Sequence, residues 1–166
     1  MSAVTIRLAE GEDDIAIVAK LWTEVAAWLA EQGTDQWQYP IKMHNIEAAV
    51  AAGSCWIAEE DGEPVGTITV DTNAEPGLWT DEELSDAVIV HRMVIARRHA
   101  GRNLGDILLQ HAEDLGRKLG RHWIRLDAWT TNTLLHDYYR RVGFRLVRIA
   151  DPTLISAALF ERPIPD

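Results

Sequence analysis

The chain has 166 residues, of which 47% are apolar and 25% charged, which predicts one soluble globular domain spanning residues 1–166. Its net charge of -10 argues against broad nucleic-acid binding, because phosphate contact favours a basic surface. The single cysteine, Cys55, excludes an internal disulfide, and the sequence shows neither a signal peptide nor an apolar run long enough to span a membrane. We therefore expect a cytoplasmic protein without membrane or nucleic-acid partners.

The N-terminal third alternates between short strand and helix patterns. Residues 4–9 alternate as in a strand. From Asp13 to Leu29, apolar residues recur at three- and four-residue steps, which predicts a helix that is acidic at its start and ends before Gly33. A polar and aromatic loop follows, and then a smaller helix near residues 45–52.

The middle and end of the chain contain most of the predicted strands. Segments 54–60 and 64–72 flank an Asp-Gly pair, which predicts a hairpin. After an acidic connection, the remaining elements are a strand at 86–95, a helix at 104–119, a strand at 122–129, a helix at 132–142 and strands at 143–150 and 155–162. This order predicts an α/β (α+β) fold, with a mixed sheet carrying helices on its faces.

The segment "RRHAGRNLGDILLQHA", residues 97–112, places a basic loop with glycines between a buried strand and a helix. Such a loop presents backbone N–H groups at the positive end of the helix dipole, an arrangement that binds phosphate. A nucleoside-triphosphate P-loop is excluded because Asp106, not Lys, follows Gly105. A dinucleotide fingerprint is excluded because it belongs after the first strand. A surface loop whose glycine allows tight packing stays open as the alternative.

The downstream segment "LDAWTTNTLLHDYYRRVGF" adds an Asn at a helix start, two tyrosines and a Gly-Phe pair. Loop and helix together resemble the GNAT superfamily of acyl-CoA N-acyltransferases. The family's pyrophosphate loop, (Arg/Gln)-x-x-Gly-x-(Gly/Ala), aligns with "AGRNLG" at 100–105, and its second motif aligns with Asn132 through Phe144. The resemblance implies a GNAT fold, with a mostly antiparallel sheet of six to seven strands and about four helices on its faces.

Two residues of the loop depart from the family pattern. Ala100 replaces the usual Arg or Gln, and Asn103 replaces the first Gly. Backbone N–H groups can still hold the anion, and Asn tolerates the conformations for which glycine is often chosen. We expect Gly101, Arg102 and the nearby Arg98 to supply flexibility and charge.

The resemblance implies acetyl-CoA as the acyl donor. It assigns the pantetheine arm to the backbone of Met93, Val94 and Ile95. The pyrophosphate contacts fall to residues 100–106, which are Ala100, Gly101, Arg102, Asn103, Leu104, Gly105 and Asp106. Asn132 and the helix after it would line the other wall, through Leu135, Tyr138 and Arg141.

Two residues are candidates for catalysis. Tyr139 matches the family's tyrosine that protonates the departing thiolate, a role that suits a phenol with an ordinary pKa of about 10. Its alternative is core packing. The amine nucleophile must lose a proton, and His91 is the candidate acceptor, because it shares strand parity with Met93 and Ile95 and because arylalkylamine members of the superfamily place a histidine there. Its alternative is a hydrogen-bonded histidine that shapes the strand.

Substrate contacts are expected in loops that combine aromatic rings and carboxylates, which suit a cationic amine. Trp37 and Trp79 are candidates, with core packing as the alternative. Asp127 is a candidate to orient water or ammonium, or else to cap a helix or pair with an arginine. The histidines show no metal-ligand spacing, so no metal is predicted. The tryptophans predicted in the core are Trp22, Trp56 and Trp123.

These observations predict an acetyl-CoA-dependent N-acetyltransferase that acts on the primary amine of a small molecule by direct transfer. Acetylation of a protein N-terminus or lysine is the nearest alternative. A non-catalytic acyl-CoA-binding module is the alternative from another class. Proteins of this superfamily often dimerise, so the resemblance allows a homodimer, although no stretch of the sequence identifies an interface.

Overall fold

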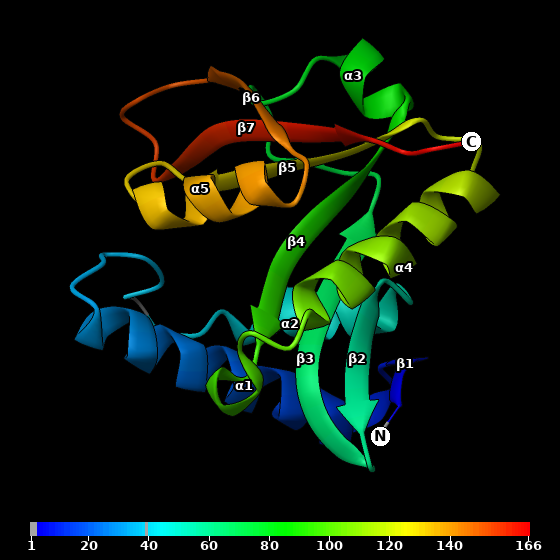
Figure 1. The fold of residues 1–166 in the computed structure, drawn as a ribbon, viewed down its shortest axis with the longest axis vertical. Coiled ribbons are helices and arrows are strands. Elements are labelled where there is room, and N and C mark those ends of the chain that lie inside the picture. Colours follow the sequence, from blue (N-terminus) through cyan, green and yellow to red (C-terminus); the bar gives the residue numbers. More distant parts are fainter. Residues whose placement is uncertain (1–2, 39) are drawn as a thin grey trace. The chain divides into compact units, whose positions relative to one another are not determined.

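The computed structural model describes residues 3–38 and 40–166. Within these residues, seven strands form one sheet in the order β1-β2-β3-β4-β5-β7-β6, accompanied by five α-helices and a short 3₁₀ helix (Figure 1). The pair β4 and β5 is parallel, whereas β1 with β2, β2 with β3, β5 with β7 and β6 with β7 are antiparallel. The predicted mixed, mostly antiparallel sheet is confirmed.

The elements follow the predicted order closely. The strands are β1 (Val4–Leu8), β2 (Cys55–Glu60), β3 (Glu63–Asp71), β4 (Ala87–Ile95), β5 (Trp123–Trp129), β6 (Arg145–Ile149) and β7 (Ser156–Pro163). The helices are α1 (Gly11–Glu31), α2 (Met43–Ala51), α3 (Asp81–Ser85), α4 (Leu104–Lys118), α5 (Thr133–Arg141) and the 3₁₀ helix η1 (Arg97–His99). The structure adds α3 and η1, which the sequence pattern did not predict.

The elements pack as two compact units. One comprises Met1–Thr69 with Arg92–Leu109, and the other comprises Val70–His91 with Gln110–Asp166. The chain passes from one unit to the other within β3, β4 and α4. The single domain expected from the chain length stays a prediction.

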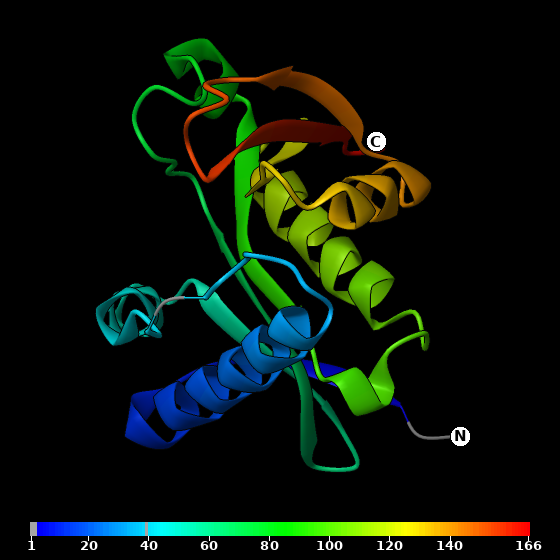
Figure 2. The same cartoon turned by 90° about the vertical axis from the view of Figure 1, so that its left-hand side faces the viewer.

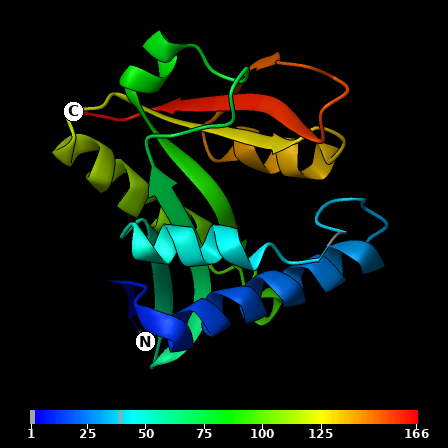
Figure 3. The same ribbon diagram turned by 180° about the vertical axis from the view of Figure 1, so that it is seen from behind.

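In the first unit, helices lie on both faces of β2 and β3. Helices α1 and α2 lie on one face (Figure 3), and the first turns of α4 lie on the other. A Cβ atom at Gly66 would lie 2.9 Å from the carbonyl oxygen of Val94 and 3.5 Å from Cδ1 of Leu108. Glycine at position 66 therefore lets β3 pack closely against its neighbours.

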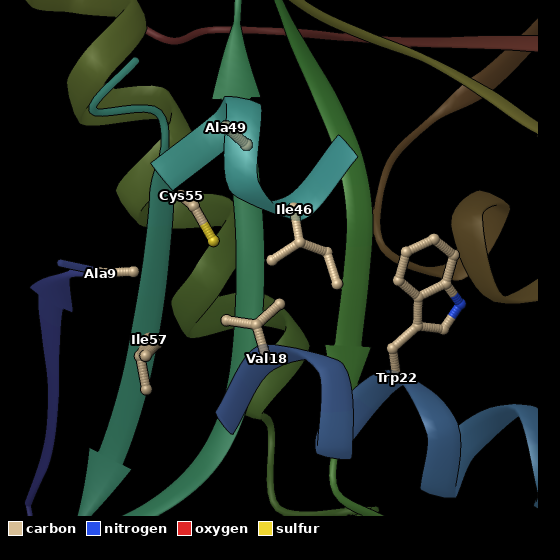
Figure 4. Close-up of a cluster of buried hydrophobic side chains, with 7 residues drawn as sticks. All are labelled: Ala9, Val18, Trp22, Ile46, Ala49, Cys55 and Ile57. Carbon is tan, nitrogen blue, oxygen red and sulfur yellow. The ribbon is translucent and has the colours of Figure 1, made fainter. Parts of the chain in front are cut away.

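One apolar cluster of the first unit lies between the two helices and the sheet. Figure 4 shows side chains from α1, α2, β2 and the end of β1 converging on this core, which consists of Ala9, Val18, Trp22, Ile46, Ala49, Cys55 and Ile57. Burial of a side chain such as Ile57 contributes about 1.5–3 kcal/mol to folding. Cys55 is buried here, and the core position predicted for Trp22 is confirmed.

In the second unit, the two faces of β7 carry different partners. Phe160 contacts Tyr139 of α5 at a ring-centroid distance of 5.7 Å, whereas Leu159 packs with Trp79 in a separate apolar cluster. Figure 2 shows α5 and α3 on opposite sides of β6 and β7. Adjacent residues of a strand point to opposite faces, so this division follows from the pleat.

Candidate active site

The loop between β4 and α4 contains two residues with left-handed backbone. Gly101 has a φ of 80° and Asn103 a φ of 61°. The carbonyl of Asn103 accepts a hydrogen bond from the N–H of Ile107 at 3.2 Å, which starts α4. Asn103 thus adopts the conformation expected of a residue that replaces glycine. The first N–H groups of α4 have no acceptor inside the helix and lie at its positive end, where an anion is stabilised.

The basic side chains of this loop have partners within the first unit. Arg98 donates to Glu63 at 2.6 Å, and Arg102 donates to Glu60 at 3.0 Å. The guanidinium of Arg97 lies 3.6 Å from the ring centroid of Trp28. Carboxylates therefore already offset the charge of Arg98 and Arg102.

The strand before the loop is irregular. Val94 is buried against Leu21 and Ala96, while Met93 and Ile95 are half-buried. Arg92 has a φ of 46°, and a left-handed residue interrupts the alternation of a strand. The argument that His91 shares a face with Met93 assumed regular alternation, and this assumption is wrong. Nothing in an arginine side chain signals such a backbone conformation.

His91 forms a pair with a residue that the sequence pattern did not single out. Its Nε2 atom lies 2.8 Å from Oδ1 of Asp71, the last residue of β3. The same nitrogen lies 3.0 Å from the carbonyl oxygen of Asn73. Both members of the pair are partly accessible, with side-chain exposures of 21% for His91 and 28% for Asp71. His91 is therefore hydrogen-bonded, as its structural alternative required, and still reachable from solvent.

Asn132 begins α5 as predicted. Its side-chain oxygen accepts a hydrogen bond from the N–H of Leu135 at 3.1 Å, so two residues of the predicted cofactor set are joined by a helix cap. Along the same helix, Tyr138 is half-buried and Arg141 is exposed.

Tyr139 lies in an aromatic cluster of the second unit. Its ring centroid is 5.4 Å from Phe144 and 5.6 Å from Tyr138, and its residue is only 8% exposed. Burial raises the pKa of the Tyr139 phenol, and the nearby Tyr138 and Asp127 raise it further. The phenol therefore keeps its proton well above neutral pH. Tyr139 thus packs against the neighbouring rings, as its structural alternative required.

The candidate substrate residues have structural partners. Trp79 is buried, and the guanidiniums of Arg125 and Arg148 each lie 5.5 Å from its ring centroid, which favours the packing interpretation. Trp37, with a φ of 59°, packs edge-on against Trp22 at 5.6 Å. Asp127 accepts a hydrogen bond from the hydroxyl of Ser156 at 2.6 Å.

The described residues, 3–38 and 40–166, include neither a metal-binding cluster nor a membrane-spanning helix. No group of three or more His, Cys, Asp or Glu side chains in this part of the chain is arranged to hold a metal ion. No helix within the described ranges combines the length and apolar character needed to cross a membrane.

Comparisons with known proteins agree with this geometry. The model of the Acetyltransferase (GNAT) family matches residues 19–144. The chain is 28% identical over 146 residues to the uncharacterized N-acetyltransferase YesJ of Bacillus subtilis, covering 81% of this chain and 78% of that protein. A GNAT-family acetyltransferase structure from Listeria monocytogenes has a TM-score of 0.78 at 26% identity and covers 96% of this chain and 94% of that one. Similar in fold is yncA of Salmonella typhimurium, a putative acetyltransferase solved with its cofactor acetyl-CoA, with a TM-score of 0.66, 17% identity and coverage of 99% and 95%. The chain belongs to the acetyltransferase (GNAT) family of acyltransferases.

Proposed function

We propose that the protein transfers the acetyl group of acetyl-CoA to the primary amine of a small molecule by direct attack of the amine on the thioester. The observation that carries the cofactor assignment is the left-handed loop at the start of α4, formed by Gly101 and Asn103. Its N–H groups suit the pyrophosphate of coenzyme A. The acetyl-CoA found with the similarly folded Salmonella protein supports the same ligand.

In the proposed reaction, His91 accepts a proton from the amine and Tyr139 supplies one to sulfur. The amine nitrogen forms a bond to the acetyl carbon, and the bond between that carbon and sulfur breaks with its electron pair leaving on sulfur. The buried phenol of Tyr139 protonates this thiolate, giving free coenzyme A. His91 returns its proton to water and Tyr139 regains one, so the reaction leaves both residues unchanged.

The cofactor assignment is tested by thermal-shift titration with acetyl-CoA, with ATP as the comparison ligand. A ligand that binds only the folded state raises the melting temperature as its concentration passes the Kd. Gly101→Val should abolish this rise, because a β-branched residue is strained at a φ of 80°. Gly120→Val is the matched control, since Gly120 has a φ of 70° and also has open space around its Cβ position. Equal shifts with ATP, or an unchanged response of Gly101→Val, would contradict the assignment.

The chemistry is tested by free-thiol release with a panel of small amines and a panel of peptides. Tyr139→Phe should lower kcat about 100-fold or more, because the ring contacts stay while the proton donor is lost. Wild-type turnover by this variant would refute the role of Tyr139. Turnover of peptides but of no small amine would refute the proposed acceptor class.

A further inference from the structure

We propose that Asp71 is a positioning residue, which holds the imidazole of His91 with its proton on Nε2 so that Nδ1 is the atom that receives the proton of the amine. This inference rests on the proposed function, in which His91 is the proton acceptor. It adds the residue that orients His91 and the ring nitrogen that reacts.

The tautomer follows from the two partners of one nitrogen. Nε2 of His91 lies 2.8 Å from Oδ1 of Asp71 and 3.0 Å from the carbonyl oxygen of Asn73. A backbone carbonyl has no proton to give, so the hydrogen of this contact must be on Nε2. A neutral imidazole carries a single N–H group, and Nδ1 therefore has the lone pair.

The carboxylate that faces His91 is itself held in place. Oδ1 of Asp71 also accepts a hydrogen bond from the N–H of Asn73 at 3.0 Å. Asp71 and Asn73 thus form a small turn that presents two oxygen atoms to the same ring nitrogen. This contact fixes the ring orientation before any substrate binds, so less reorganisation is needed when the proton moves.

The charge of Asp71 has a second consequence. Once Nδ1 has taken the proton of the amine, His91 is a cation, and the carboxylate 2.8 Å from Nε2 stabilises it. Stabilising the cation favours transfer of the proton to His91. Because the amine loses this proton as its nitrogen attacks the thioester carbon, the attack is favoured as well. A neutral acceptor at position 71 would keep the ring orientation and lose this stabilisation.

The second unit offers a matched control pair. His122 and Asp86 form another imidazole–carboxylate contact, but here Nδ1 is the nitrogen that lies 2.6 Å from the carboxylate. Both side chains are more accessible, at 68% for His122 and 44% for Asp86. No catalytic role is proposed for this pair. A substitution of Asp86 therefore measures the effect of removing an imidazole–carboxylate contact that is not part of the reaction.

The experiment begins with ¹⁵N NMR of the histidine rings, with the His91 signals assigned from the spectrum of His91→Gln. The protonated and bare nitrogens of a neutral imidazole resonate far apart, so the tautomer is read directly. We expect a protonated Nε2 and a bare Nδ1 for His91. A protonated Nδ1 would overturn the proposal without any activity measurement.

The kinetic arm uses Asp71→Asn with Asp86→Asn as its control, assayed by free-thiol release with the amine that the panel identifies. Asp71→Asn should lower kcat about tenfold or more while the KM for acetyl-CoA stays the same, because only stabilisation of the cationic ring is lost. Asp86→Asn should leave kcat unchanged. Asp71→Glu, which restores the charge, should recover part of the loss and shows that a folded protein tolerates change at this position.

The possible outcomes distinguish the role of Asp71 from the proposed role of His91 as proton acceptor. Wild-type kcat in Asp71→Asn, together with a large loss in His91→Gln, would overturn the role of Asp71 and leave His91 as the proton acceptor. Wild-type kcat in His91→Gln would refute the proposed acceptor itself, and this inference with it.

Discussion

The buried phenol of Tyr139 makes a specific prediction for stability at alkaline pH. An unfolded tyrosine ionises with a pKa of about 10. Because the pKa of Tyr139 is raised in the folded protein, chiefly by burial, the unfolded chain releases this proton first as the pH rises. The stability tied to Tyr139 is therefore fully present below about pH 10 and is lost above it. At about pH 11, the unfolded state gains about 1.4 kcal/mol from this ionisation.

The comparison is between the wild-type protein and Tyr139→Phe, whose ring keeps the edge-on contact with Phe144 and the tilted contact with Phe160. The free energy of unfolding is measured in urea from pH 7 to about pH 11, and the difference between the two proteins removes the other groups that titrate. The wild type should lose about 1.4 kcal/mol relative to the variant over this range. A difference that stays constant with pH would show that the phenol ionises at its ordinary pKa, and would contradict the effect of burial on Tyr139.

Three further predictions concern stability. Contact with Arg148, more than a backbone hydrogen bond from Thr80, lowers the pKa of Glu83 to about 2. At pH 7 the free energy of unfolding of the wild type should therefore exceed that of Glu83→Gln by about 1 kcal/mol, a value reduced because Arg148 is partly exposed to solvent. Urea titrations should show this difference disappearing as the pH falls from about 4.5 to about 2. Gly66→Ala places a Cβ 2.9 Å from the carbonyl of Val94 and should lower the free energy of unfolding by about 1–3 kcal/mol, so equal stability would contradict the close approach. Asn103→Ala should cost about 1–2 kcal/mol while Asn103→Gly costs much less, and equal losses in thermal melts would contradict the left-handed backbone there.

Most of the fold could be predicted because its signals are local. The Asp-Gly pair of the hairpin adopts the left-handed backbone that such turns need, with φ of 53° at Asp61 and 75° at Gly62. Helix α3 was missed because five residues are too few for a helical period, although Thr80 and Glu83 form the capping box that its sequence allows. Trp56 and Trp123, predicted in the core, are only half-buried.

The candidate site was less accessible from sequence. The loop before α4 and the helix cap at Asn132 use residue types with strong backbone preferences. Local sequence alone could therefore predict where each of them lies. The contact of His91 with Asp71 depends instead on how two strands distant in sequence are placed, and the irregular backbone at Arg92 leaves no trace in side-chain type. A polar contact between two strands of this kind can be found only from the three-dimensional structure.

The cap formed by Asn132 limits which residues this position can tolerate. Loss of its hydrogen bond to the N–H of Leu135 would cost about 1 kcal/mol and fray the start of the helix that carries Tyr139. A residue at this position must therefore cap the helix, whether or not its side chain also contacts a ligand. Asp, Ser and Thr can also cap, so these substitutions separate the capping role from a contact with the ligand. An alanine variant would remove the cap and any such contact at once.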